Sequence, residues 1–343
     1  MPVYEGAEMP AGATMSTILE GLTEALSSSA TRDIAKAVGL KPELVTQGMG
    51  VVGPLIATAL ANKASTAGGA VDLMQLLPKG GTSSLLGNPA NPVDGGTGDT
   101  AVSSILGSGA GAIGATLDRA LGFKASSLLG FAASLVLGLI GKIAGEKKLD
   151  PAGLAQLLAG DAADFEKTGG ETARLVRLAL DAGHQAANVK AKYTPVQWER
   201  VRLAPVAAAY VVMMADKSGP VGAMKEMRAA NGAIDDAKKV ASPTSVLSLA
   251  FDSDFSVEEL SKFARGRTNA DALRTVREAM EVVTRNSPAD VSTYRRLVAD
   301  VASQVASASR EGGVLRFGGT HASASERAAL DQLRSVIGDR QGR

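Results

Sequence analysis

The sequence predicts an all-α protein made of two multihelical domains, and three observations lead to this fold class. Hydrophobic residues make up 45% of the 343 residues, enough for sizeable cores, although only 3% are aromatic. Apolar residues recur three or four positions apart, as at Leu273, Val276, Met280 and Val283. Helix start signals are frequent, whereas strand signals are hard to find. A chain of this length is expected to form two domains.

The predicted domain boundary follows a change in composition. Charged residues are denser beyond residue 160 than before it, while glycine becomes less frequent. Adjacent glycines in Phe165-Glu-Lys-Thr-Gly-Gly170 interrupt the chain near this change. We therefore expect one helical domain over residues 1–164 and a second over residues 165–343.

The first domain contains an internal repeat. Two short sequences recur in the same order, and in each copy an apolar run lies between them. A duplicated helical unit predicts paired helices that bury their apolar faces on each other. The first copy comprises Ala37-Val-Gly-Leu-Lys41, the run 44–61 and Leu73-Met-Gln-Leu-Leu77, and the second comprises Ala120-Leu-Gly-Phe-Lys124, the run 128–144 and Leu154-Ala-Gln-Leu-Leu158.

A glycine-rich segment, residues 79–114, joins the two copies. It includes Asn88-Pro-Ala-Asn-Pro92 and Asp94-Gly-Gly-Thr-Gly98, a composition typical of a flexible linker. We expect this segment to be disordered, with Leu85-Leu86 and Ile105-Leu106 docking on the core. The sequence leaves open whether the segment orders when the protein assembles.

Helix caps place the elements of the second domain. Thr194-Pro-Val-Gln197 offers a Thr cap followed by Pro in the first turn, and Ser256-Val-Glu-Glu259 and Ser323-Ala-Ser-Glu326 fit the capping box. Asp150-Pro151, in the first domain, and Ser287-Pro-Ala-Asp290 predict helix starts in the same way. All of these signals favour helix.

The repeated segments carry a resemblance to a known family. The first domain resembles the bacterial YidB-like family of unknown function over about residues 15–160. The resemblance implies a multihelical fold with no established activity and no catalytic residues. It rests on Ala37-Val-Gly-Leu40, Gly53-Pro-Leu-Ile-Ala-Thr-Ala-Leu60, Leu73-Met-Gln-Leu-Leu77, Ile105-Leu-Gly107 and Asp150-Pro-Ala-Gly-Leu-Ala-Gln-Leu-Leu158. The second copy departs from the pattern at Ser134 to Gly138, where a Pro matching Pro54 is expected, so that helix is predicted to be straighter.

The second domain is similar, over short stretches, to TerB-like helical domains associated with tellurite resistance. The stretches are Met213-Met-Ala-Asp-Lys-Ser-Gly219 with Glu226, and Val305-Ala-Ser-Ala-Ser-Arg-Glu-Gly-Gly313 followed by Ser325-Glu-Arg-Ala-Ala-Leu330. This resemblance implies an acidic metal-binding loop. The spacing from Asp216 to Glu226 is longer than that loop requires, so we assign no metal ligand.

Composition and charge exclude several function classes. The formal net charge of +1 argues against a chain that acts through bulk electrostatics. The absence of cysteine removes disulfides, thiolate metal sites and thiol nucleophiles, and only His184 and His321 remain for histidine chemistry. Residues 1–30 contain no Lys or Arg, unlike a secretory signal. We therefore expect a bacterial cytoplasmic protein.

Two motifs match ligand-binding patterns only in part. Gly109-Ala-Gly-Ala-Ile-Gly114 fits the glycine pattern of dinucleotide-binding proteins. That site also requires a preceding strand and an acidic residue about 20 residues later, but position 134 is Ser. Asp252-Ser-Asp254 with Glu258 and Glu259 suggests a calcium loop. Its sixth position is Val257 rather than Gly, and its twelfth is Phe263 rather than Glu. We assign neither a cofactor nor a metal.

Other polar residues also have simpler explanations than catalysis or binding. Asp181 lies three residues before His184 and would orient it as a general base, yet no nucleophile can be named beside them. Tyr193 and Trp198 are expected to be core or docking anchors. A basic cluster lacks interleaved aromatic residues and contains acidic ones, so we predict a solvated helix surface and no nucleic acid. The cluster comprises Arg265, Arg267, Arg274, Arg277, Arg295 and Arg296.

The apolar run 128–144 raises the question of a membrane. No charge occurs between Lys124 and Lys142, a length at the lower limit of a membrane span. The matching run 44–61 carries Thr46, Gln47 and Pro54, and we expect that it does not span a bilayer. A buried core helix is therefore the simpler interpretation of residues 128–144.

These observations lead to one functional hypothesis with two alternatives. No set of residues combines a nucleophile, a base and an orienting group, so the protein is predicted to be non-enzymatic, with no catalytic, cofactor-binding or metal-binding residues. Its alanine- and glycine-rich helices favour close helix packing, and we expect a homo-oligomer or a scaffold for a protein partner. The alternatives are a membrane-associated, stress-related protein that uses residues 128–144 and a metal-binding TerB-like module.

Overall fold

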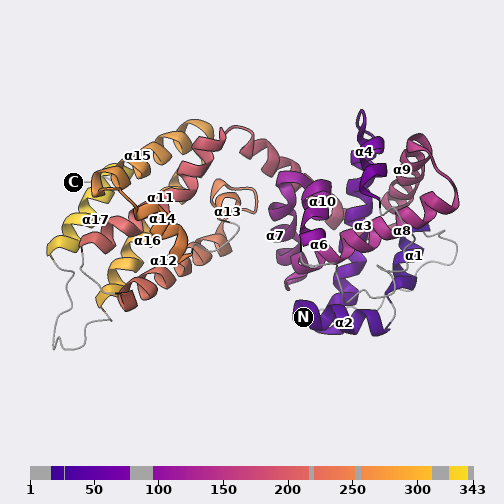
Figure 1. Cartoon of the computed structure of the whole chain (residues 1–343), viewed down its shortest axis with the longest axis horizontal. Coiled ribbons are helices and arrows are strands. Elements are labelled where there is room, and N and C mark those ends of the chain that lie inside the picture. The colour runs from indigo at the N-terminus through magenta and orange to yellow at the C-terminus, as the bar shows by residue number, and fades with distance from the viewer. Residues whose placement is uncertain are drawn as a thin grey trace. The chain divides into compact units, whose positions relative to one another are not determined.

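All regular structure that the computed structural model describes is helical, as the sequence predicts (Figure 1). It describes residues 17–26, 28–77, 96–215, 220–251, 256–310 and 324–338, and no strand occurs among them. The contacts divide the chain into two compact units, Met1–His184 (unit 1) and Gln185–Arg343 (unit 2). This division falls within helix α10 (Gly170–Lys190), beyond the predicted boundary between residues 164 and 165. The predicted boundary and the duplicated unit stay predictions.

Two apolar helices form the centre of unit 1. They are α3 (Pro42–Ala64) and α8 (Leu129–Glu146), which pack against each other. Residues 51–57 of α3 and 135–140 of α8 are consecutively buried, so neither helix has a solvent-facing side along these stretches. The predicted apolar helix at 128–144 is thus a buried core helix in the structure.

Shorter or more amphipathic helices surround this pair. α1 lies on α8, α2 and α9 lie on α3, and α6 lies on α8. The first turn of α1 is capped from a distance, because the Ile18 backbone N–H donates to Asp161 Oδ2 of α9 at 2.9 Å. The surrounding elements are α1 (Thr17–Ala25), α2 (Ser28–Val38), α4 (Gly69–Leu76), α6 (Gly96–Leu106), η1 (Gly107–Gly109), α7 (Ala110–Leu121), η2 (Ala125–Leu128), α9 (Pro151–Thr168) and α10 (Gly170–Lys190).

The prediction of a flexible linker over residues 79–114 is wrong for residues 96–114, which form α6, η1 and the start of α7. Here glycine permits contact between backbones instead of flexibility. A Cβ on Gly98 would lie 3.2 Å from the Gly130 Cα, and one on Gly109 would lie 2.5 Å from the Gly183 carbonyl oxygen. Ile105 is buried as predicted, whereas residues 79–95, including Leu85-Leu86, lie outside the described residues.

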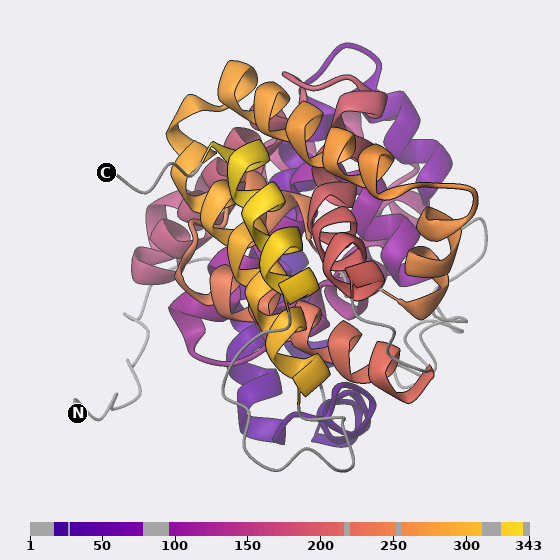
Figure 2. The same cartoon turned by 90° about the vertical axis from the view of Figure 1, so that its left-hand side faces the viewer.

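Unit 2 is built around α11 (Pro195–Ala215), whose residues 204–212 are consecutively buried. α11 packs against α15, α16 and α17, and α12 lies along α16. In Figure 2, α17 is the yellow helix on the side of unit 2 that faces the viewer. The remaining elements are α12 (Pro220–Val240), α13 (Val246–Ala250), α14 (Val257–Ala264), α15 (Asn269–Asn286), η3 (Pro288–Asp290), α16 (Val291–Arg310) and α17 (Ala324–Ile337).

Most of the predicted helix caps are present. Thr194 and Gln197 exchange hydrogen bonds, Ser256 and Glu259 form a capping box, and Asp150 accepts from the Gly153 N–H. Ser287-Pro-Ala-Asp290 does start a helix, because η3 begins at Pro288 and leads into α16, but the predicted side-chain cap is wrong. Ser287 Oγ lies 2.8 Å from the Tyr193 hydroxyl, and Asp290 Oδ2 accepts from the Val246 N–H. Position 323 lies outside the described residues.

A proline inside α11 explains a buried tyrosine. Pro205 has no N–H, so the Val201 carbonyl four residues earlier lacks its helical hydrogen bond. The Tyr294 hydroxyl of α16 donates to that carbonyl at 2.6 Å. Tyr294 is fully buried, and this burial raises the pKa of its hydroxyl well above the ordinary value.

Candidate protein-association site

A groove between α12 and α16 is the candidate site in unit 2. Its volume is about 320 Å³. The apolar lining comes from Ala233, Ala237 and Leu297, with Val240 at the end of α12. The polar lining comprises Asp236, Thr293, Arg296, Asp300 and Gln304.

The groove follows both helices over several turns. On α12 it uses positions 233, 236, 237 and 240, and on α16 it uses positions from 293 to 304. Spacings of three, four and seven residues place such positions on one side of a helix. At 1.5 Å per residue, the α16 side is roughly 16 Å long. That length matches about three turns of a helix laid along it.

Val240 is the most unusual side chain of this site. It is 84% exposed, the highest value among the large apolar side chains in the described part of the chain. The next is Val196, at the start of α11, which is 61% exposed and does not line the groove. Val240 therefore gives the groove an apolar end that no described residue covers.

Charges of both signs stand beside each other along the groove. Lys239 Nζ lies 2.7 Å from Asp236 Oδ1, and this hydrogen bond raises the pKa of the lysine. On α16, Arg296 and Asp300 are exposed and one turn apart. A face with this mixture has no strong attraction for a polyanion or a polycation.

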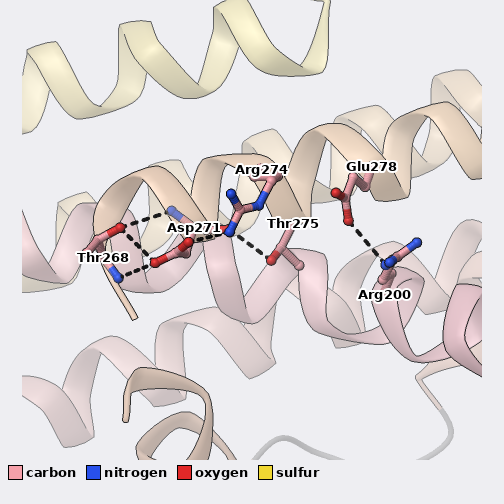
Figure 3. Close-up of polar contacts among 6 residues, drawn as sticks. All are labelled: Arg200, Thr268, Asp271, Arg274, Thr275 and Glu278. Atoms are coloured by element: carbon pink, nitrogen blue, oxygen red, sulfur yellow. Dashed lines mark hydrogen bonds and ion pairs between the residues drawn. The ribbon is translucent and has the colours of Figure 1, made fainter. Parts of the chain in front are cut away.

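The predicted basic cluster is spread over contacts within unit 2. Arg267 donates to the Phe263 carbonyl at 2.9 Å and lies 4.4 Å from the centre of its ring. Arg295 donates to the Ile337 carbonyl at 2.8 Å. Arg274 pairs with Asp271 (Figure 3). These contacts agree with the predicted helix surface, and the absence of nucleic acid among the partners stays a prediction.

Figure 3 also shows a capping box that the sequence analysis missed. Thr268 Oγ1 accepts from the Asp271 N–H, and Asp271 Oδ2 accepts from the Thr268 N–H at 2.9 Å. The hydrogen bonds from Thr268 lower the pKa of the Asp271 carboxyl. On the same helix, Glu278 pairs with Arg200 of α11 at 3.1 Å and ties α15 to the central helix. The sequence does contain a signal for this cap, because Thr268 is followed three residues later by Asp271, with Asp in place of the usual Glu.

The glycine motif at residues 109–114 begins at the last residue of the 3-10 helix η1, which follows helix α6, and no strand of the kind that dinucleotide binding requires precedes it among the described residues 96–108. Its first glycine meets Gly183, and a Cβ on its last, Gly114, would lie 2.9 Å from Ser126 Cβ. Helix packing therefore accounts for two of the three pattern glycines.

The other predicted polar residues do not form a cluster. His184 and Asp181 are both exposed on α10, and Glu226 is completely buried on α12. Glu258 and Glu259 are on α14, where Glu258 pairs with Lys262 and Glu259 forms its cap. In the described ranges, no group of three or more His, Asp or Glu side chains could hold a metal ion. Outside those ranges lie Asp216, Asp252, Asp254 and His321.

The comparison with known families concerns unit 1. Residues 20–143 match the model of a family described as "Bacterial protein of unknown function (DUF937)". The predicted YidB-like resemblance is thereby confirmed, over a shorter stretch than expected. The DUF937 segment begins within α1 and ends within α8, so it contains both apolar central helices. Neither the curated proteins nor the solved structures contain a match to the chain.

The groove lies outside the DUF937 segment, and the TerB-like resemblance of unit 2 stays a prediction. Sequence reasoning also missed the groove. Its two sides are contributed by α12 and α16, and the pairing of these helices follows from long-range packing. The local signal was an apolar residue, Val240, directly after Lys238 and Lys239 at a helix end.

Proposed function

We propose that the protein is a non-enzymatic helical scaffold that associates with further copies of itself through the α12–α16 groove. The observation that carries this proposal is the 84% exposed Val240 at the end of an otherwise partly apolar groove. In a helix-in-groove contact, apolar side chains of one helix enter a groove between helices of the partner.

The charges of the groove favour a second copy as the occupant. In a two-fold contact the same surface is used on both sides, so the surface must be complementary to itself. Arg296 of one copy would face Asp236 or Asp300 of the other, and the reverse contact would follow by symmetry. A partner of a single charge sign would instead meet a repelling group at every turn.

Burial of Val240 would contribute about 1.5–3 kcal/mol per copy. A stable dimer generally buries at least 1,200 Å² in total, so neighbouring residues of α12 and α16 must contribute as well. The proposal therefore predicts association that depends on protein concentration. In this proposal the described residues have no catalytic role. His184, the one histidine among them, is exposed on α10, and we identify no nucleophile beside it.

The test compares two exposed valines by sedimentation equilibrium of the full chain. V240D places a charge in the groove and is expected to weaken association at least tenfold. V196D makes the same change on α11, away from the groove, and is expected to leave association unchanged. A chain that stays monomeric at the highest concentration, or equal effects of the two variants, would contradict the proposal.

A charge exchange sharpens the test. R296D puts a third carboxylate in the groove and is expected to weaken association. Adding D300R restores one charge of each sign on α16 and is expected to recover most of the affinity. Failure of the double variant to recover, while circular dichroism shows normal helix content, would exclude electrostatic self-complementarity.

A further inference from the structure

The central helices of unit 1 have the dimensions of membrane spans. Three stretches among the described residues are long and apolar enough to cross a bilayer, by length and composition alone: Pro42–Ala64, Thr100–Leu121 and Ala125–Glu146, with mean hydropathy of 1.6, 1.3 and 1.9. Pro42–Ala64 meets this criterion although it carries Thr46, Gln47 and Pro54, and the expectation that it does not span a bilayer stays a prediction. The second stretch is interrupted by η1 and contains Asp118 and Arg119, so α3 and α8 are the two continuous helices with the dimensions of a span.

The hydroxyl groups within α3 and α8 are satisfied by their own helices. Thr58 donates to the Pro54 carbonyl at 2.9 Å, and Thr46 donates to the Pro42 carbonyl at 3.2 Å. In α8, Ser134 donates to the Gly130 carbonyl at 3.0 Å. A bilayer has no water to satisfy polar groups, so internally bonded hydroxyls lower the penalty of transfer into hydrocarbon.

Lysines mark both ends of the two helices. Lys41 precedes α3 and Lys63 lies in its last turn, while Lys124 precedes the uncharged stretch of α8 and Lys142 follows it. Lysines at the ends of an apolar helix reach the headgroups and are attracted by anionic lipids. Lys63 now donates to the Ser104 carbonyl of α6 at 2.8 Å, so it reaches the headgroups only after α6 has left α3. At the other end of α3, Glu43 adds a carboxylate beside Lys41.

We propose that unit 1 binds anionic bilayers and transfers α3 and α8 from its core into the hydrocarbon. Lipid tails are about as apolar as the leucines that now surround these helices, so the exchange keeps the apolar side chains away from water. α1 covers α8 by way of Gly21, whose Cβ position lies 3.1 Å from Leu139 Cδ2. α6 also lies on α8, so both α1 and α6 must leave α8 before α8 can enter the bilayer. This proposal concerns unit 1 and is independent of association through unit 2.

The single tryptophan provides a direct test. Trp198 is the only Trp in the chain and belongs to unit 2. Phe131 is a half-buried residue of α8, so F131W combined with W198F moves the only indole into α8. Vesicles of phosphatidylglycerol and phosphatidylethanolamine with brominated acyl chains quench an indole that enters the hydrocarbon.

The emission of the F131W/W198F variant is expected to fall several-fold with brominated vesicles relative to unbrominated ones. The wild-type emission, which comes from Trp198, is expected to stay unchanged. An unquenched indole in α8 of the folded chain, as judged by circular dichroism, would overturn the proposal. Equal quenching of Trp198 would also overturn it, because unit 2 would then enter the bilayer.

An engineered disulfide tests the opening step. Because the chain has no cysteine, G21C and L139C introduce the only two thiols, and the Cβ position at 21 lies 3.9 Å from Leu139 Cγ, the atom that the Cys sulfur would replace. In the F131W/W198F background, the oxidised protein is expected to lose quenching and the reduced protein to regain it. Equal quenching in both redox states would show that α1 does not have to leave α8.

Discussion

The two units hold their helices together by different means. In unit 1 the backbones of neighbouring helices touch, at Gly98 with Gly130 and at Gly109 with Gly183. In unit 2 the contacts run through side chains, such as the Arg200–Glu278 ion pair and the Tyr294 hydroxyl on the Val201 carbonyl. Unit 1 therefore depends on the absence of side chains at a few positions in addition to polar groups such as Asp161, whereas the contacts named in unit 2 depend on polar groups alone.

The prolines inside α3 and α11 show the same contrast. Pro54 leaves the Gly50 carbonyl without its helical donor, and Gly50 is exposed, where water is the available partner. Pro205 does the same to Val201, which is completely buried, and there Tyr294 supplies the donor. In both helices a proline leaves one carbonyl without its helical hydrogen bond. That carbonyl is exposed to water in unit 1, whereas in unit 2 it accepts a hydrogen bond from a side chain.

The largest expected effect comes from one methyl group at a backbone contact of unit 1. G109A places a Cβ 2.5 Å from the Gly183 carbonyl oxygen, so the backbones must separate. We expect the free energy of unfolding to fall by about 3 kcal/mol. The matched control, G111A, adds the same methyl group where nothing lies within 4 Å and is expected to raise it by up to about 1 kcal/mol. Urea denaturation followed by circular dichroism measures both, and effects of the same sign would refute the backbone-contact explanation.

A smaller effect is expected from the hydroxyl group that completes α11. Y294F removes the donor to the buried Val201 carbonyl and is expected to lower the free energy of unfolding by about 2 kcal/mol. Adding P205A supplies a backbone N–H for the same carbonyl, so the double variant is expected to recover most of the loss. If the two changes are additive in a double-mutant cycle measured by urea denaturation, Tyr294 does not substitute for the missing helical bond.

The smallest effect is expected at the exposed cap of α15. T268A removes the side-chain cap and is expected to lower the free energy of unfolding by about 1 kcal/mol. Because hydrogen bonds from Thr268 lower the pKa of Asp271 below 3.8, this carboxylate stabilises the folded state above that pH and loses the effect as the pH falls through its folded pKa. D271N is expected to reduce the acid dependence of urea denaturation. An unchanged pH profile would show that the cap is not linked to folding.

The fold class was predictable because helix periodicity and caps are local signals. Thr194, Ser256 and Asp150 can be recognised within four residues of the groups they cap. Glycine was misjudged at residues 96–114, since the same residue allows either flexibility or contact between backbones, and only the position of Gly130 or Gly183 distinguishes the two. Ser287 and Asp290 were misjudged for the same reason, because their partners, Tyr193 and Val246, are distant in sequence.

The candidate site was less accessible from sequence. The groove needs α12 beside α16, and no local pattern specifies that pairing. Val240 was visible as an apolar residue at a helix end, but its exposure depends on which neighbours cover it. The membrane question was visible in the uncharged run before Lys142, and the internally bonded Thr58 and Ser134 hydroxyls required the structure.

The cap of α1 has a consequence for the order of folding. The Ile18 N–H is satisfied by Asp161, 143 residues further along the chain. During synthesis the cap of α1 therefore cannot form until α9, which follows it in the chain, has been made. Contacts between such distant residues slow folding, because a long loop must close before they form. We therefore expect α1, the first helix that the structure describes, to be completed only after α9 has formed.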